Sequence, residues 1–278
     1  MSSPNIYIYQ IFYDEASKSK LQKGFIPLDN SANSRPDWAE YWPIRNVLSN
    51  KSFNPDDYIG FLSPKFYEKT GCTSEYVLDG VSSAKHSVYS FSPFFDQIAL
   101  YFNSFEQGEG FHKGIYKAGN LFLKKIGANF ELGNIVSDCS TCIFSNYFVA
   151  RYDFWKIWFG WAEKLFEIAE GKEGELATLL GNYTMYQAKY NTHFLKVFLL
   201  ERLVTLVLTS WNLQAAYMPD LNKIPFTLTA AKFLGEFLAC DALKGQYLKT
   251  NKIIYLREFQ NIRNRVLQSL NPSSHQAK

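Results

Sequence analysis

The sequence predicts one α/β domain with a mostly parallel central sheet flanked by helices and a helical C-terminal part. Short β-branched and aromatic runs alternate with longer segments of helical spacing, which is typical of parallel strands joined by helices. No internal repeat and no Pro/Ser-rich linker divides the 278 residues, a length that one hydrophobic core can serve. We therefore expect a single domain over residues 1–278, with its core over about residues 6–210 and a helical extension over about residues 211–270.

The first expected strand is I-Y-I-Y-Q-I-F at residues 6–12, a β-branched and aromatic run between Pro4 and Asp14. The helix expected next begins near Pro36 and is open to interruption at Pro43. A strongly amphipathic helix is expected at residues 152–170 and is stopped by a glycine. The remaining strands are expected at residues 58–62 and 88–91, with a further strand or strand pair at residues 141–150. The remaining helices are expected at residues 66–70, 94–105, 194–211 and from 229 onward.

Composition and charge exclude several classes of protein. The net charge of +3, from 29 basic and 26 acidic residues, is too balanced for nucleic-acid binding, which needs a clustered basic surface. No apolar run reaches the roughly 18 residues that a membrane span needs, and the N-terminus lacks the features of a secretory signal. We expect a cytoplasmic protein whose four cysteines are reduced. Aromatic residues, at 17%, suit both core packing and stacking on sugar rings.

Several motifs that carry chemistry are absent. The sequence has no G-x-x-x-x-G-K-[ST] phosphate loop, no G-x-G-x-x-G after a strand and no G-x-S-x-G elbow. Cys139 and Cys142 form a lone C-x-x-C, which we interpret as two core residues because no second pair or nearby His completes a zinc set. The four His residues lack metal-ligand spacing, so we expect neither a metal nor another cofactor.

Polar residues follow the first two expected strands, at the edge where parallel sheets bind ligands. Tyr13, Asp14 and Glu15 follow the first strand, and Ser63 and Lys65 follow the second. We predict that these residues bind a donor substrate, with Lys65 neutralising a diphosphate as a fixed cation in place of a divalent ion. The alternative is that Lys65 is a solvated residue that opens the next helix.

Three further segments carry polar candidates. Asp96 and Gln97 follow the third expected strand, and either bind substrate, with Asp96 as a base, or serve the start of the next helix. Glu109 and His112 lie in a polar, glycine-rich turn that either contacts an acceptor or only connects two elements. Asn146 lies within an apolar run, where a buried amide needs a protein partner or a ligand hydroxyl.

The expected helix at residues 194–211 carries Glu201 and Arg202 in an otherwise apolar run. Two charges there are costly unless they are paired or used. Either the two residues form a structural ion pair, or Glu201 is a general base and Arg202 binds a phosphate or orients Glu201.

The preceding long helix carries three tryptophans at helical spacing, which form either a packing stripe or a membrane-interface stripe. They are Trp155, Trp158 and Trp161.

Four segments occur in an order that resembles a known family. They are D-W-A-E-Y-W-P-I-R-N at residues 37–46, D-Y-I-G at residues 57–60, N-x-F-V-x and a Phe/Trp-rich helix at residues 146–158, and E-R-L at residues 201–203. Together they resemble bacterial glycosyltransferases of GT-A type that act in capsule and lipopolysaccharide assembly. The resemblance covers about residues 6–210 and implies a GT-A-like fold that transfers a sugar from a nucleoside diphosphate donor.

One departure from this family bears on the chemistry. After D-Y-I-G the relatives carry a His-Tyr-Arg-Arg type sequence, where this chain has L-S-P-K-F at residues 62–66. Asp-x-Asp, which holds a metal on the diphosphate in many GT-A enzymes, occurs nowhere in the chain. The substitution implies that cationic side chains offset the charge of the leaving diphosphate. Lys65 and Arg202 are the first candidates, and Arg45 and Arg151 are further ones.

We therefore expect a metal-independent glycosyltransferase in which Lys65 stabilises the leaving group and Asp96 or Glu201 takes the acceptor's proton. The expected acceptor is a glycan or lipid-linked glycan, and peripheral association with the inner face of the cytoplasmic membrane stays open. The rival hypothesis, favoured by the missing Asp-x-Asp, is a non-catalytic scaffold or partner of a polysaccharide synthase. A nucleotidyl-transfer enzyme on a similar sheet is a third hypothesis. It would need a glycine-rich phosphate loop after the first strand, and Y-D-E-A-S at residues 13–17 is not one. The expected acceptor-binding residues are Gln97, Glu109, His112 and Asn146.

Overall fold

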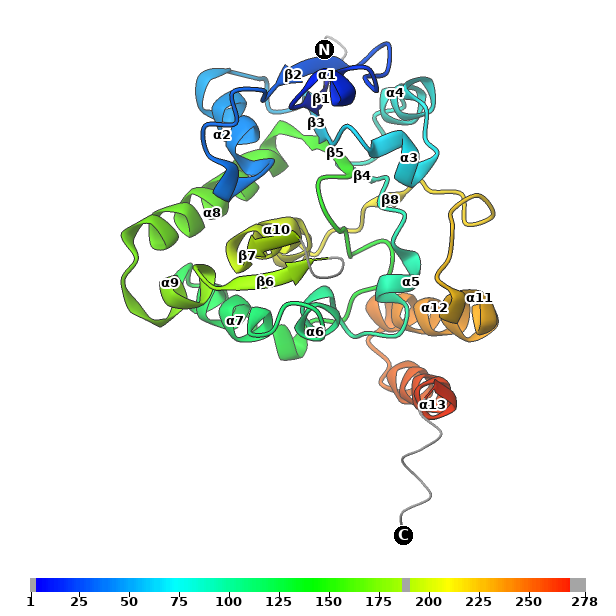
Figure 1. The fold of residues 1–278 in the computed structure, drawn as a ribbon. Helices are drawn as coiled ribbons and strands as arrows, with labels where there is room; N and C mark the ends of the chain where they lie inside the picture. The colour runs from blue at the N-terminus through cyan, green and yellow to red at the C-terminus, as the bar shows by residue number, and fades with distance from the viewer. Residues whose placement is uncertain (1–3, 187–190, 271–278) are drawn as a thin grey trace.

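The computed structural model describes residues 4–186 and 191–270, which form a six-stranded sheet, a two-stranded sheet and surrounding helices (Figure 1). The larger sheet has the strand order β2-β1-β3-β5-β4-β8. β5 pairs antiparallel with β3 and with β4, while the other neighbours are parallel. The predicted α/β class and mostly parallel sheet are thus confirmed. The strands are β1 (Ile6–Phe12), β2 (Ile26–Asp29), β3 (Tyr58–Leu62), β4 (Val88–Ser90), β5 (Phe148–Arg151), β6 (Tyr183–Tyr186), β7 (Asn191–Phe194) and β8 (Ala216–Tyr217).

Helices separate most of the strands and form the whole end of the chain as far as residue 270. The α-helices are α1 (Glu15–Lys18), α2 (Tyr41–Asn50), α3 (Phe66–Thr70), α4 (Ser74–Ser82), α5 (Phe95–Ile98), α6 (Ser104–Glu109), α7 (Ile115–Lys125), α8 (Tyr152–Gly171), α9 (Gly174–Leu180), α10 (Leu195–Ser210), α11 (Leu228–Lys232), α12 (Leu234–Thr250) and α13 (Ile254–Leu270). Two 3-10 helices are η1 (Pro36–Trp38) and η2 (Leu132–Asn134).

Helices cover both faces of the central strands. Successive residues of a strand point to opposite faces, so neighbours join different cores. Tyr9 and Ile59 pack with α2, α8 and α10, whereas Ile8 and Tyr58 pack with α3 and α4. Because both faces are buried, β1 and β3 are apolar at almost every position. A third cluster joins α5 to α11, α12 and α13.

The D-Y-I-G segment has a structural role. The buried Asp57 carboxylate accepts hydrogen bonds from the Asn5 backbone N–H at 3.0 Å and from the Asn54 N–H at 2.9 Å. A Cβ at Gly60 would lie 2.8 Å from Val149 Cγ2 on β5, closer than the two strands allow. The motif therefore anchors the start of β3 and permits its close pairing with β5.

Several expected boundaries were wrong. The strand expected at residues 141–150 occupies only Phe148–Arg151, and β8 joins the sheet from the segment that was expected to be helical. The helix expected at residues 94–105 is divided into α5 and α6, because the Asn103 side chain caps α6 by accepting from Phe105 N at 3.0 Å. Pro43 does not interrupt α2, since it lies in the first turn, where the missing N–H has no partner to lose.

The tryptophan stripe of α8 packs in the core. Trp155 and Trp158 are buried, Trp161 is half-buried, and Trp155 Nε1 donates to the Ile59 carbonyl at 2.8 Å. Cys139 and Cys142 are free thiols. No helix in the described part of the chain is long and apolar enough to cross a membrane.

Candidate functional site

A cavity of about 590 Å³ opens at the carboxyl edge of the sheet. Tyr13 follows β1, Ser63 follows β3, and Asn146 precedes the antiparallel β5, so all three lie at this edge. Glu40, just before α2, and Glu201, on α10, also line the cavity. The cavity is therefore built where open α/β sheets bind their ligands.

The four segments that resemble glycosyltransferases meet around this cavity. Three supply lining residues, and the fourth, D-Y-I-G, forms the strand that delivers Ser63 to the edge. Aromatic side chains form much of the wall, which suits stacking on a sugar ring or a base. The principal lining residues are Tyr13, Asn30, Trp38, Glu40, Tyr41, Ser63, Lys65, Lys69, Asn146, Tyr147, Trp158, His193 and Glu201.

Glu40 is a carboxylate fixed at the cavity surface. Tyr13 Oη donates to Glu40 Oε1 at 3.0 Å, and Asn146 Nδ2 donates to Glu40 Oε2 at 3.0 Å. Burial raises the pKa of Glu40, although both hydrogen bonds and the nearby Lys69 ammonium oppose that rise. Burial and the Glu40 carboxylate raise the pKa of Tyr13 above its usual range, so the phenol keeps the proton that it donates. Each oxygen of the Glu40 carboxylate thus accepts one hydrogen bond, which fixes the orientation of the side chain.

Glu201 is the second carboxylate of the cavity, and it is half-buried. Burial raises its pKa to about 7, the Glu40 charge adds to the rise, and Arg202 and Lys69 oppose it. Within residues 4–186 and 191–270 the Glu201 carboxylate accepts no hydrogen bond and forms no ion pair. A carboxylate with a pKa near neutrality and no hydrogen-bond or ion-pair partner among the described residues is suited to accept a proton from a ligand.

Two lysines from α3 line the same cavity. Lys65 precedes the helix and Lys69 follows one turn later, a spacing that places both side chains on one helix face. Lys65 is exposed and has no ion pair among the described residues. Lys69 is half-buried with its ammonium 5.7 Å from the centre of the Tyr147 ring, and Tyr147 Oη shares a 3.1 Å hydrogen bond with Ser63 Oγ. Two cations and two carboxylates thus line the same cavity, and the Lys69 charge acts on both Glu40 and Glu201.

Backbone strain gathers at this cavity. Asn33, Ala39 and Ser145 have positive φ values of 37°, 47° and 59°, and all three line the cavity. Such conformations cost about 1–3 kcal/mol each in a residue other than glycine, and persist when the surroundings impose them. Their concentration here supports a functional role for the cavity.

The wall formed by η1 and α2 is tied to α8 and α10. Arg45 donates two hydrogen bonds to Glu163 on α8, at 2.7 and 2.8 Å, and the Tyr41 hydroxyl bonds to the same carboxylate. Lys196 on α10 donates to Asp37 at 2.6 Å. Because these groups are partly shielded from water, they hold the wall in one position. Arg45 is therefore committed to Glu163 and does not line the cavity.

Arg202 lies outside the cavity, although it is adjacent to Glu201. It is buried, and its guanidinium donates to the carbonyls of Ser104 and Phe198, each at 3.0 Å, and to Gln107 Oε1 at 3.3 Å. It forms no ion pair with Glu201, so neither role expected for the pair describes Arg202. Its guanidinium fastens α6 to α10.

Arg202→Met is expected to lower the free energy of unfolding by about 2–4 kcal/mol, because it leaves buried acceptors without their charged donor. Urea unfolding measures the change. Arg265→Met, at an exposed position of α13, is the matched control and should stay within about 0.5 kcal/mol of the wild type. An Arg202→Met variant as stable as the control would contradict the structural role.

Other residues that were predicted to bind the donor substrate lie outside the cavity. Asp14 caps α1, accepting from Ser17 N at 2.7 Å, and Glu15 pairs with Lys18 at 3.1 Å in solvent. Neither lines the cavity. Arg151 pairs with Asp56 and, at 3.2 Å, with Asp153.

The candidates after β4 and α6 are likewise engaged in protein contacts. Asp96 accepts from the Thr227 N–H at 2.9 Å, which orients the segment that enters α11, and Gln97 accepts from Gln107 Nε2 at 3.0 Å. Glu109 caps α7, accepting from the Gly114 and Tyr116 N–H groups at 2.8 and 2.9 Å. These contacts explain the three side chains without a substrate.

His112 is buried and stacks on Phe198 with ring centres 3.7 Å apart. Its Nδ1 lies 3.3 Å from Thr184 Oγ1. Burial, with Arg202 nearby, lowers the pKa of His112 to about 4, so the ring is neutral at physiological pH. His112 therefore belongs to the packing behind the cavity, and Asn146 is the predicted acceptor residue that lines it.

Of the lysine and glutamate residues that line the cavity, the sequence analysis missed Glu40 and Lys69. Glu40 lies in the quoted D-W-A-E-Y-W segment, but nothing in the sequence indicated that its side chain faces β5. Lys69 could have been found, because it lies one helical turn after Lys65.

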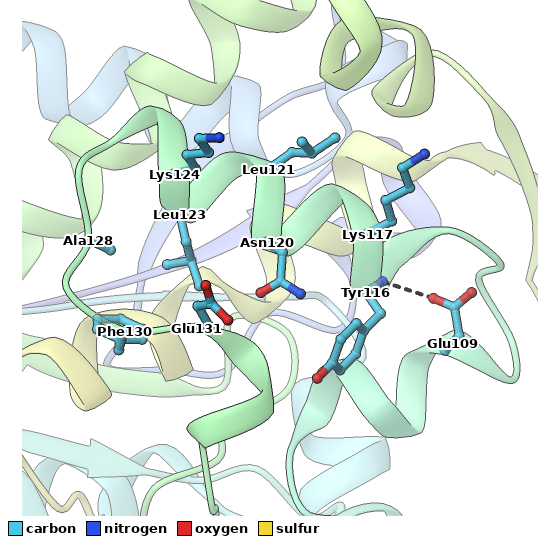
Figure 2. Close-up of a pocket in the computed structure, with 10 residues that line it drawn as sticks. All are labelled: Glu109, Tyr116, Lys117, Asn120, Leu121, Leu123, Lys124, Ala128, Phe130 and Glu131. Atoms are coloured by element: carbon cyan, nitrogen blue, oxygen red, sulfur yellow. Dashed lines mark hydrogen bonds between the residues drawn. The ribbon is translucent and has the colours of Figure 1, made fainter.

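A second cavity, of about 880 Å³, lies along α7 (Figure 2). Figure 2 shows Lys117, Leu121 and Lys124 along one side of the helix, and Tyr116 and Asn120 along the other. Every lining residue comes from the segment 109–131, and no strand of the sheet contributes. Glu109 and Glu131 line this groove together with two lysines, but Glu109 caps α7 and no lining residue has a positive φ. The edge cavity, with its strained backbone and its position at the sheet, is therefore the better candidate site.

The chain matches no protein-family model, no curated protein and no solved structure. In the described segments, no group of three or more His, Cys, Asp or Glu side chains is arranged to hold a metal ion. We therefore infer the function from the edge cavity and from the resemblance of the segments around it.

Proposed function

We propose that this chain is a glycosyltransferase and that the edge cavity is its active site. One observation carries the proposal: two half-buried carboxylates, Glu40 and Glu201, line one cavity with Lys65 and Lys69 at the carboxyl edge of a mostly parallel sheet. The convergence of the four resembling segments on this cavity supports the same assignment. The donor is a nucleoside diphosphate sugar, and the acceptor is a glycan or lipid-linked glycan of a surface polysaccharide.

The cavity residues divide the chemistry of a direct displacement. The acceptor oxygen bonds to the anomeric carbon as the bond from that carbon to the diphosphate oxygen breaks. Glu201 takes the acceptor's proton, because its pKa of about 7 leaves it partly ionised yet basic at neutral pH. Lys65 and Lys69 stabilise the negative charge that develops on the leaving diphosphate. Glu40, held by Tyr13 and Asn146, presents a fixed acceptor to sugar hydroxyls.

A panel of nucleotide sugars tests this proposal. We expect a thermal shift and ligand-observed NMR signals with at least one sugar of UDP, GDP or dTDP, and a glycosylated product with a suitable acceptor. Ligand binding raises the midpoint of thermal unfolding because it stabilises the folded state alone. If no member of the panel binds, the chain is a non-catalytic scaffold, and the proposal is wrong.

Transfer is expected to continue after dialysis against EDTA, because the two lysines supply the positive charge near the diphosphate. Product formation with and without EDTA measures this. Complete inhibition by EDTA that Mg²⁺ or Mn²⁺ reverses would contradict the expectation. Such a result would change the role of the lysines and leave the proposed reaction class intact.

A further inference from the structure

The turn between α12 and α13 exposes two large apolar side chains. Asn251, at a φ of 53°, ends α12, and α13 begins three residues later. Ile253 is 55% exposed and Ile254 is 58% exposed. They contribute little to the core, since α13 packs through buried residues such as Phe259. An exposed pair of isoleucines at the tip of a helical hairpin needs another explanation.

The same turn is basic. Lys249 and Lys252 lie on one side of the isoleucines, and Arg257 lies one helical turn beyond them. No acidic residue occurs between Asp241 and Glu258. Each of the three basic side chains is exposed, and none forms an ion pair with another residue that the structure describes. Their charge is therefore available to an external anion.

We propose that the α12–α13 turn docks the protein on an anionic lipid bilayer. Lysine and arginine side chains are attracted to anionic headgroups, while exposed isoleucines enter the boundary between headgroups and acyl chains. The turn lines neither cavity, so it suits a flat surface better than a small ligand. Figure 1 shows α12 and α13 at the opposite end of the molecule from β1 and β2, so those strands do not obstruct the approach.

Vesicle co-sedimentation of the full chain tests this docking. The probes are vesicles of phosphatidylcholine alone and of phosphatidylcholine mixed with phosphatidylglycerol. We expect binding to the mixed vesicles, weak binding to the neutral ones, and release at high salt because salt screens the basic residues. The Ile253→Ser/Ile254→Ser and Lys249→Glu/Lys252→Glu variants should each bind the mixed vesicles about tenfold more weakly or worse.

Matched controls change the same residue types elsewhere. Leu228, 92% exposed on α11, is the apolar control as Leu228→Ser, and Lys232→Glu is the charge control. Both should bind as the wild type does. Because all the substituted side chains are exposed, the thermal unfolding midpoints should also stay unchanged. Lack of wild-type binding to mixed vesicles, or turn variants that bind like the controls, would overturn the proposal.

This inference stands apart from sugar transfer. Vesicle binding is measured without a nucleotide sugar or an acceptor, so a chain that fails to bind vesicles can still bind a donor. Conversely, if the chain binds vesicles but no donor, the docking proposal stands and the proposed sugar transfer is wrong.

Discussion

Glu201→Gln is expected to reduce the rate of sugar transfer about 10²–10⁴-fold at neutral pH while donor affinity stays within about twofold. An amide has the shape of the carboxylate but accepts no proton. In the wild type, only ionised Glu201 acts as base, so the rate should rise with pH through about 7. The variant should lose this dependence. Glu167→Gln, an exposed carboxylate on α8, is the matched control.

The same substitution has a predictable effect on stability. Burial raises the pKa of Glu201 from 4.5 to about 7, so the folded chain binds this proton more tightly than the unfolded chain does. Glu201 therefore lowers the free energy of unfolding as pH rises from about 4.5 to about 7, by on the order of 1–3 kcal/mol. Above about pH 7, Glu201→Gln should melt at a higher temperature than the wild type, and the difference should vanish below about pH 4.5. A variant that melts lower at about pH 8 would show that Glu201 is not desolvated.

The Lys65→Ala/Lys69→Ala variant is expected to lower kcat about 10²–10³-fold, because both ammonium groups act on charge that develops only as the diphosphate leaves. Steady-state kinetics measure the effect, and Lys125→Ala, an exposed lysine on α7, is the control. Lys69→Ala alone should also shift the rising, acidic limb of the pH–rate profile to higher pH, since the Lys69 charge lowers the pKa of Glu201. Normal turnover of the double variant would remove both lysines from the mechanism.

The position of the cavity could be predicted from the sequence because it depends on where the strands end, which short segments of sequence indicate. Apolar runs identify strands, and parallel strands bring their carboxyl ends to one edge. Tyr13, Ser63 and Lys65 follow from that rule, and the structure places all three at the cavity. Asn146 reaches the same edge by a different route, since it precedes an antiparallel strand.

The direction of individual side chains could not be predicted in the same way. Consecutive residues of a helix point about 100° apart, so Glu201 and Arg202 need not both face the cavity. The sequence does not say which of them does. Asp96 and Gln97 follow β4, which β5 separates from β3, and contacts with Thr227 and Gln107 engage them there.

The placement of β5 has a consequence for the nascent chain. β3 and β4 do not pair with each other, and each is completed by β5, which is made many residues later. Until residues 148–151 leave the ribosome, β3 and β4 each keep an open row of N–H and C=O groups. Closing such a distant pairing is slow. Because β8, the other partner of β4, is made later still, translation that stalls between β4 and β5 leaves one edge of β3 and both edges of β4 unpaired. This is the kind of intermediate that aggregates or requires a chaperone.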